Sequence, residues 1–133
     1  MKAFIDANIP MYAAGRDHPA KLPSVALLKR VAEGAIDAII DAEVLQEILH
    51  RYLAINHLEQ GLVVFDSFEK LIGEVLPIEQ QDVVAARELL GTHRGITARD
   101  AIHIAIMLRH RIRLIYSYDR HFDGLDGIER REP

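Results

Sequence analysis

Acidic side chains occur at four places where the sequence pattern suggests more than a solvent-exposed charge. Asp6 directly follows the short apolar run 3–5, and Asp119 follows a second such run late in the chain. Both runs have the pattern of buried strands, and ligands bind outside the carboxyl ends of strands in an open α/β sheet. Asp100 lies in the first turn of a strongly apolar helical segment, and Glu47 borders the apolar stripe of another. These four carboxylates are therefore candidates for one shared site.

Carboxylates that converge repel one another unless a cation compensates their charge. The sequence contains no cysteine, so thiolate ligands and thiol catalysis are excluded. Oxygen ligands alone favour a hard divalent cation such as Mg²⁺ or Mn²⁺. The acids thus predict a metal site rather than a thiol or disulfide chemistry.

Each acid also has an ordinary structural explanation. Asp100 can stabilise the positive end of its helix, and Glu47 can pair with Arg51 one turn later. Asp6 and Asp119 can form turns after their strands. The turn explanation is weakest for Asp6, because no partner for its charge lies nearby in the sequence.

Hydrophobic periodicity predicts the elements that would position these acids. Strands are predicted at 3–5, 35–40, 74–78 and 114–117, with a short edge strand in 127–133. Helices are predicted at 23–32, 42–53, 58–72, 80–90 and 98–110. The segment from Asp6 to Pro10 is predicted to be a turn. Short strands that alternate with helices predict an α/β fold, in which a mainly parallel sheet carries helices on both faces.

Length and composition restrict the broader class. The 133 residues form no repeat or linker, which predicts a single domain over 1–133. No apolar run approaches the roughly 20 residues that span a bilayer, and Asp6 follows the start too closely for a signal peptide. We therefore expect a cytoplasmic protein without a membrane segment. The net charge of −4 becomes neutral when the four candidate site acids are set aside, so it does not argue against a nucleic-acid ligand.

Four short motifs, taken together, resemble a known family. They are Phe4-Ile5-Asp6-Ala7-Asn8, a glutamate at position 47, Thr97-Ala98-Arg99-Asp100-Ala101-Ile102-His103, and Ser117-Tyr118-Asp119-Arg120-His121-Phe122. In this order, and spread over nearly the whole chain, they look like the PIN domain and specifically its small VapC-type toxins. Each motif alone is common, whereas the four in sequence are specific.

The resemblance implies a metal-dependent endoribonuclease that cleaves RNA phosphodiesters with a metal-activated water. It further implies Mg²⁺ or Mn²⁺ as cofactor, a homodimer, and a small antitoxin protein as inhibitor. The apolar surface of the predicted helices between 22 and 72 agrees with self-association. The family's acidic quartet corresponds to Asp6, Glu47, Asp100 and Asp119, of which Asp6 and Asp100 are our preferred direct ligands.

Several further residues follow from the same resemblance. Asn8 corresponds to an accessory asparagine, and Asp123 lies where some members have a fifth acid. Two positions depart from the family pattern: Ala7 replaces a small hydroxyl residue, and Ser117 replaces the usual threonine. The first change removes a hydroxyl group, and the second retains one. His103, in contrast, is expected to be a hydrogen-bonded core residue, because its helix is so apolar.

Basic residues near the motifs are candidates for RNA contacts. Between positions 94 and 121 six arginines face only two acids, and the whole chain has twelve arginines against four lysines. Arg94, Arg99 and Arg120 lie nearest the motifs, so we expect them to hold flanking phosphates. Base composition of the genome would explain the arginine excess equally well.

Two other functions have to be weighed. A receiver-type phosphoacceptor domain has a similar size and binds Mg²⁺, but it would need adjacent acids after the first strand and a lysine after the last. Here Ala7 follows Asp6, and Arg120 follows Asp119. A catalytically silent PIN-like module that binds RNA or protein is the second alternative, and the intact acids argue against it.

Overall fold

Five strands form one parallel sheet in the computed structural model, which describes residues 2–133. The strands are β1 (Lys2–Ile5), β2 (Asp37–Asp41), β3 (Glu74–Leu76), β4 (Leu114–Tyr116) and β5 (Glu129–Arg131), and their order across the sheet is β3-β2-β1-β4-β5. The central strand β1 pairs through Phe4 with Ile39 of β2 and with Ile115 of β4. These three side chains are buried, as a parallel sheet covered on both faces requires.

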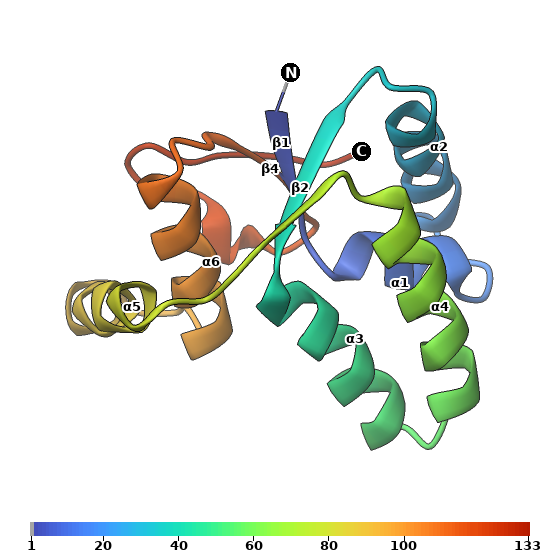
Figure 1. The fold of residues 1–133 in the computed structure, drawn as a ribbon, viewed down its shortest axis with the longest axis horizontal. Helices are drawn as coiled ribbons and strands as arrows, with labels where there is room; N and C mark the ends of the chain where they lie inside the picture. Colours follow the sequence, from blue (N-terminus) through green and yellow to red (C-terminus); the bar gives the residue numbers. More distant parts are fainter. Residues whose placement is uncertain (1) are drawn as a thin grey trace.

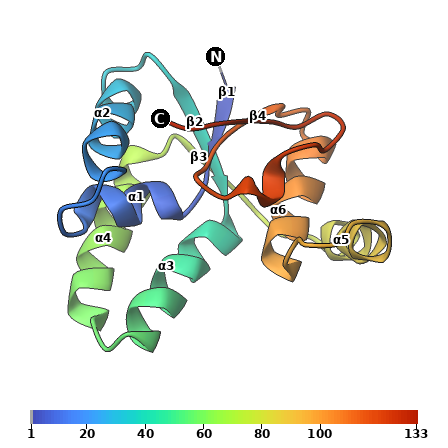
Figure 2. The same cartoon turned by 180° about the vertical axis from the view of Figure 1, so that it is seen from behind.

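Helices connect the strands and cover both faces of the sheet (Figures 1 and 2). They are α1 (Asn8–Ala14), α2 (Lys21–Ala32), α3 (Ala42–Ala54), α4 (Leu58–Leu71), α5 (Gln80–Thr92) and α6 (Ala98–Arg109), with a short 3-10 helix η1 (Arg120–Phe122). Figure 1 shows α1, α2 and α4 on one side of the sheet and α5 and α6 on the other. Crossovers between parallel strands are right-handed as a rule. Helices therefore change sides when the chain, after adding β2 and β3 on one side of β1, reverses to add β4 and β5 on the other.

The α/β class, the parallel sheet, and the helices on both faces are confirmed. The sequence-predicted turn at 6–10 is wrong, because α1 begins at Asn8. Pro10 occupies the third position of α1, where a backbone N–H has no partner within the helix, so the proline is tolerated. Pro23 occupies the same position of α2. This helix was predicted to begin at Pro23, but it begins two residues earlier, at Lys21.

Most predicted ends and caps agree with the structure. Asp41 and Thr97 accept hydrogen bonds from backbone N–H groups at the starts of α3 and α6. The strand β3 lies at an edge of the sheet and ends immediately before Pro77, as a proline without a backbone donor requires. The predicted C-terminal edge strand is β5.

Helix α6 lies between α5 and the sheet, and its middle turns are buried. No helix within residues 2–133 combines the length and the apolar character needed to cross a bilayer.

An ion pair between exposed Arg109 and buried Asp82 joins α5 to α6. Arg109 Nε lies 2.7 Å from Asp82 Oδ1, and Arg109 Nη2 lies 2.9 Å from Asp82 Oδ2. The Asp82 side chain is only 1% exposed, and these hydrogen bonds lower the pKa of its carboxyl group. The pair therefore contributes to the free energy of unfolding at neutral pH.

We expect Arg109→Ala to lower the free energy of unfolding by about 2 kcal/mol, because Asp82 then keeps a buried charge without its partner. Urea unfolding followed by circular dichroism measures this change. Arg87→Ala is the matched control, since the Arg87–Glu88 pair is exposed and its loss changes stability by no more than about 0.5 kcal/mol. Equal effects of the two substitutions would contradict the prediction.

Candidate active site

The acids gather where the direction of strand addition reverses. From β1 the chain continues to β2 on one side, whereas β4 pairs with β1 on the other. The carboxyl ends of β1 and β4 thus flank the topological switch point, the place where open α/β sheets bind ligands. Asp6 directly follows β1, and Asp119 lies three residues beyond β4.

All four carboxylates of the predicted quartet line one open pocket of about 210 Å³. Asp6 directly follows β1, Glu47 lies on α3, Asp100 in the first turn of α6, and Asp119 in the segment after β4. Asn8 and Arg99 line the same pocket. The structure therefore brings together side chains that are separated by as many as 113 positions in the sequence.

Ser117 and Ala7 fix the carboxylate of Asp6. The Ser117 hydroxyl donates to Asp6 Oδ2 over 2.5 Å, and the Ala7 backbone N–H donates to Asp6 Oδ1 over 2.8 Å. The Ser117 oxygen in turn accepts from the Asn8 amide at 3.2 Å and from the Asp119 backbone N–H at 2.9 Å. Position 7 thus holds Asp6 through its backbone, so the absence of a hydroxyl there leaves this contact intact.

Burial changes the acidity of Asp6. Desolvation, partly offset by the positive charge of His103, raises the pKa of Asp6 from 3.8 to about 6. The negative charge of Glu47 raises it further, whereas the hydrogen bonds from Ser117 and Ala7 lower it. The ionised form of Asp6 is therefore less stable in this pocket than it would be in water. A cation bound in the pocket would offset the free-energy cost of burying this charge.

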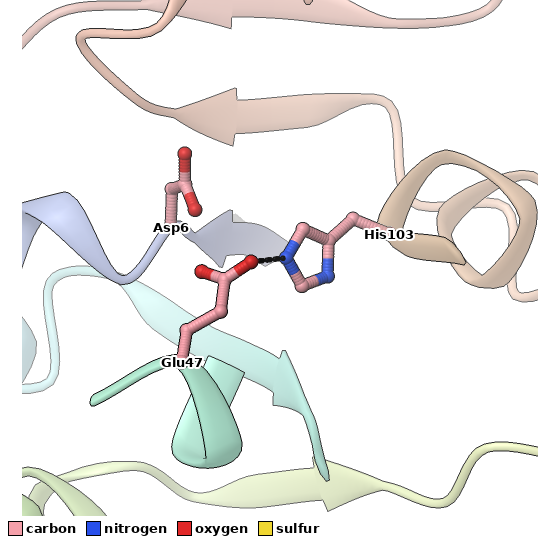
Figure 3. A group of neighbouring side chains, drawn as sticks. All are labelled: Asp6, Glu47 and His103. Atoms are coloured by element: carbon pink, nitrogen blue, oxygen red, sulfur yellow. Dashed lines mark hydrogen bonds and ion pairs between the residues drawn. The ribbon is translucent and has the colours of Figure 1, made fainter. Parts of the chain in front are cut away.

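His103 holds Glu47 from below the pocket. Its Nε2 lies 3.1 Å from Glu47 Oε1, the contact drawn in Figure 3, and its Nδ1 lies 2.7 Å from Asp41 Oδ2. His103 and Asp41 are fully buried. Burial alone would lower the pKa of His103, but the charge and hydrogen bond of Asp41, together with Glu47 and Asp6, raise it well above 6.5. His103 is therefore an imidazolium between two carboxylates, which orients Glu47 and partly neutralises the acidic pocket.

The prediction that His103 is a hydrogen-bonded core residue agrees with this geometry. The alternative pairing of Glu47 with Arg51 does not occur, because Glu47 contacts His103 and lies 3.8 Å from Arg99 Nε instead.

Asp100 and Asp119 combine local structural contacts with their place in the pocket. Asp100 Oδ2 accepts the backbone N–H of Thr97 at 3.1 Å in a capping box, and Asp119 Oδ1 accepts the backbone N–H of His121 at 2.9 Å. Asp100 thus has its expected role at the start of a helix, and Asp119 has its expected role in a turn. Asp100 Oδ1, however, accepts no hydrogen bond from any residue in 2–133 and is accessible to a ligand.

His121 is also part of the site, although no role was predicted for it from the sequence. Its Nδ1 lies 3.1 Å from both Asp100 Oδ2 and Asp119 Oδ1, and so links the two acids. Its position two residues after Asp119 was the one indication in the sequence. The 3-10 helix η1 turns the chain there, so that His121 faces the start of α6.

Other predicted residues lie elsewhere. Asp123 is paired with Arg130 of β5, at 2.7 and 3.2 Å, and does not line the acidic pocket. Its role here is to connect the end of η1 with β5. Of the three arginines predicted to contact RNA, only Arg99 lines the pocket, whereas Arg94 and Arg120 are exposed outside it.

The donor set fits a hard divalent cation. Ligand atoms of Asp6, Glu47 and His103 lie within 4.8 Å of one another, as do those of Asp100, Asp119 and His121. Both nitrogens of His103 are already bonded to carboxylates, so oxygen atoms are the available donors of the first group. Carboxylate oxygens are the ligands that Mg²⁺ and Mn²⁺ prefer.

Known proteins resemble this chain in sequence and in fold. The VapC13 ribonuclease of Mycobacterium tuberculosis is 47% identical over 126 residues, covering 95% of this chain and 96% of that protein, and a VapC ribonuclease of Mycobacterium bovis matches equally. The VapC20 structure from M. tuberculosis, described as a sarcin-ricin loop cleaving toxin, has a TM-score of 0.74 at 16% identity, covering 95% of this chain and 98% of that one.

Rickettsia felis VapBC2, solved with a promoter DNA fragment, gives a TM-score of 0.76 at 15% identity and covers 99% of this chain and 98% of that chain. The family model for the PIN domain matches residues 3–128. The fold, the quartet of acids at the switch point and these matches together show that the chain belongs to the PIN-domain family, among its VapC members.

Proposed function

We propose that this chain is a metal-dependent endoribonuclease and the toxin of a toxin–antitoxin pair. The observation that carries the proposal is the convergence of Asp6, Glu47, Asp100 and Asp119 on one pocket at the switch point of the sheet. The relatives that match nearly the whole chain are ribonucleases by name, which supports RNA as the substrate. Membership in the PIN family excludes the receiver-type alternative.

Asp6 and Asp100 would hold Mg²⁺ or Mn²⁺ directly, with Glu47 and Asp119 as further ligands or as acceptors from coordinated water. The ion would lower the pKa of a water molecule and neutralise charge on the phosphate. Ser117 and Asn8 keep Asp6 in position, and His103 does the same for Glu47. Arg99, at the rim of the pocket, supplies a positive charge for the RNA backbone.

We expect the purified protein to cleave single-stranded RNA with Mg²⁺ or Mn²⁺, to lose this activity in excess EDTA, and to regain it when Mn²⁺ is restored. Gel analysis of a labelled RNA measures the cleavage. Asp100→Asn, purified in parallel, controls for contaminating nuclease. Cleavage that persists undiminished in EDTA would refute the metal mechanism, and no cleavage under any metal condition would favour the silent-module alternative.

Two protein partners belong to the proposal. Similar folds have been solved as VapBC complexes, for example from Rickettsia felis and Salmonella typhimurium, which supports a small antitoxin as the inhibitor of this chain. Exposed apolar side chains on α2 and α4, among them Leu22 and Val63, support a homodimer. We also propose a cytoplasmic location for the protein, because its proposed RNA substrate lies inside the cell.

Self-association should appear in light scattering as twice the mass of the chain at tens of micromolar, a range typical of ordinary interfaces. Val63 is 65% exposed on α4, so Val63→Glu should weaken the dimer by placing a charge in its apolar contact. Val83→Glu is the control, because Val83 is 50% exposed on α5, on the opposite side of the sheet. A monomeric mass for the wild type, or equal weakening by both substitutions, would contradict the prediction.

A further inference from the structure

A second pocket adjoins the acidic one. It has a volume of about 680 Å³ and lies among α1, the segment that follows it, the end of α3 and the start of α4. Asn8, Met11 and Arg51 line both pockets, so the two lie side by side. A ligand chain bound at the four acids can therefore extend into this second pocket, which we call the basic pocket.

The charge of the basic pocket is opposite to that of its neighbour. Arg16, His18, Arg51 and His57 are among its lining residues, and no Asp or Glu within residues 2–133 lines it. The side chains of Arg16 and Arg51 form no hydrogen bond or ion pair with any residue in the range 2–133. By contrast, the guanidinium groups of Arg99, Arg109 and Arg130 all meet carboxylates.

The position of Arg51 follows from the contacts of Glu47. Glu47 and Arg51 are one turn apart on α3 and would ordinarily pair, but Glu47 is held by His103 on the other side. Arg51 is thereby left without an ion-pair partner among residues 2–133, at the junction of the two pockets. Two unpaired guanidinium groups in a concave surface without acids are suited to phosphate groups, which arginine binds in bidentate fashion.

An aromatic pair lies beside these arginines. The rings of Tyr12 and His18 are stacked with centroids 4.6 Å apart, and the edge of Tyr118 packs against Tyr12 at 5.2 Å. His18 Nδ1 accepts the backbone N–H of Ala20 at 3.0 Å, which fixes the plane of its ring. The side chain of His18 is nevertheless exposed. An exposed ring held in a fixed orientation can stack on an unpaired base.

We propose that the basic pocket binds the nucleotides of single-stranded RNA that flank the scissile phosphate, with Arg16 and Arg51 on backbone phosphates and His18 against a base. The proposal rests on the ribonuclease function, because the acidic pocket is then the place of the scissile phosphodiester. In this proposal the RNA contacts the basic pocket and not Arg94 and Arg120, which line neither pocket.

Binding of a labelled single-stranded RNA of about 12 nucleotides, a length within the range of single-strand binding sites, tests the proposal by fluorescence anisotropy. EDTA prevents cleavage, and the titration is repeated at several KCl concentrations. Arg16→Gln/Arg51→Gln should weaken binding and flatten the slope of log K against log [KCl] by about 1.4, since each single-strand phosphate contact contributes about 0.7. His18→Ala should weaken binding about fivefold or more without changing the slope, because it removes stacking and no phosphate contact.

Arg30→Gln/Arg113→Gln is the matched control, since it removes the same charge from two exposed arginines that line neither pocket. We expect it to retain nearly wild-type affinity, and thermal melts verify that every variant is folded. Equal loss in the two double variants would overturn the proposal in favour of general charge attraction. Wild-type RNA affinity in Arg16→Gln/Arg51→Gln would also overturn the proposal. The basic pocket would then be a candidate site for a protein partner instead of RNA.

The test separates this proposal from the proposed function. A wild-type protein that cleaves RNA with Mn²⁺, while the pocket variants bind RNA normally, would remove the basic pocket and leave the ribonuclease intact. RNA binding that depends on Arg16 and Arg51, in a protein that never cleaves with Mg²⁺ or Mn²⁺, would remove the ribonuclease function and keep the pocket as an RNA-binding site.

Discussion

Asp6→Asn is expected to reduce RNA cleavage by more than about 100-fold, because even the loss of groups that only support metal ligands lowers activity about 10- to 100-fold. Asp6 lies at the centre of the proposed metal site, where Ser117 and the Ala7 backbone fix its carboxylate in one orientation. Asparagine has nearly the same shape, but it carries no charge and offers one oxygen instead of two. The substitution therefore removes a metal ligand while it changes the packing around β1 very little.

Initial rates of cleavage of a labelled RNA, measured over a range of Mn²⁺ concentrations, give the size of the loss. Asp37→Asn is the matched control, because Asp37 is an exposed residue at the start of β2, at the opposite edge of the sheet. It should cleave at the wild-type rate. If Asp6→Asn is folded and cleaves RNA as fast as Asp37→Asn, Asp6 is not part of the catalytic site.

The convergence of the acids could be predicted from the sequence because it follows from the topology of the sheet. In a parallel sheet, the carboxyl ends of all strands lie at one edge, so Asp6 and Asp119 had to meet there once 3–5 and 114–117 were recognised as strands. Asp100 joins them because Thr97 caps α6 at the same edge. The local pattern of each segment thus contained enough information to place three of the four carboxylates.

Other features depend on contacts that no local pattern records. The partners of His103 are Asp41 and Glu47, which lie 62 and 56 positions away in the sequence, so its charge state could not be inferred from its apolar helix. Helix α1 was hidden because Pro10 is a turn signal in sequence, although a proline in a first helical turn breaks no hydrogen bond. The basic pocket depends on Arg16 and Arg51, which belong to no motif and come to line one pocket only when the segment after α1 folds near the end of α3.

Metal-free wild-type protein should lose stability between about pH 4 and pH 6 through Asp6. The folded state raises the pKa of Asp6 from 3.8 to about 6, so folding favours the protonated carboxyl group. The resulting stability is fully present below pH 3.8 and is lost as the pH rises through about 6. A shift of this size corresponds to about 3 kcal/mol. Asp6→Asn cannot ionise and should lack this pH dependence.

Two neighbouring titrations fall outside this interval and can be distinguished. The lowered pKa of Asp82 makes its contribution disappear as the pH falls below about 3.8, whereas the contribution of His103 is complete below pH 6.5 and is lost as the pH rises from there through its raised pKa. The difference in free energy of unfolding between wild type and Asp6→Asn reports Asp6 together with its charge coupling to His103, because both proteins contain Asp82 but only the wild type has a carboxylate at position 6 to raise the pKa of His103. Urea unfolding in EDTA at pH 4, 5, 6 and 7 measures it.

Adding millimolar Mn²⁺ at pH 7 completes the test, because a cation that binds only the folded protein raises its melting temperature by mass action. The wild type, whose Asp6 is ionised and strained at this pH, should show the full increase, and Asp6→Asn should lose most of it. Parallel pH profiles for the two proteins in EDTA would mean that burial does not strain the Asp6 carboxylate. Equal increases with Mn²⁺ would mean that Asp6 is no ligand, and the metal site would then have to be built on Asp100, Asp119 and His121 instead.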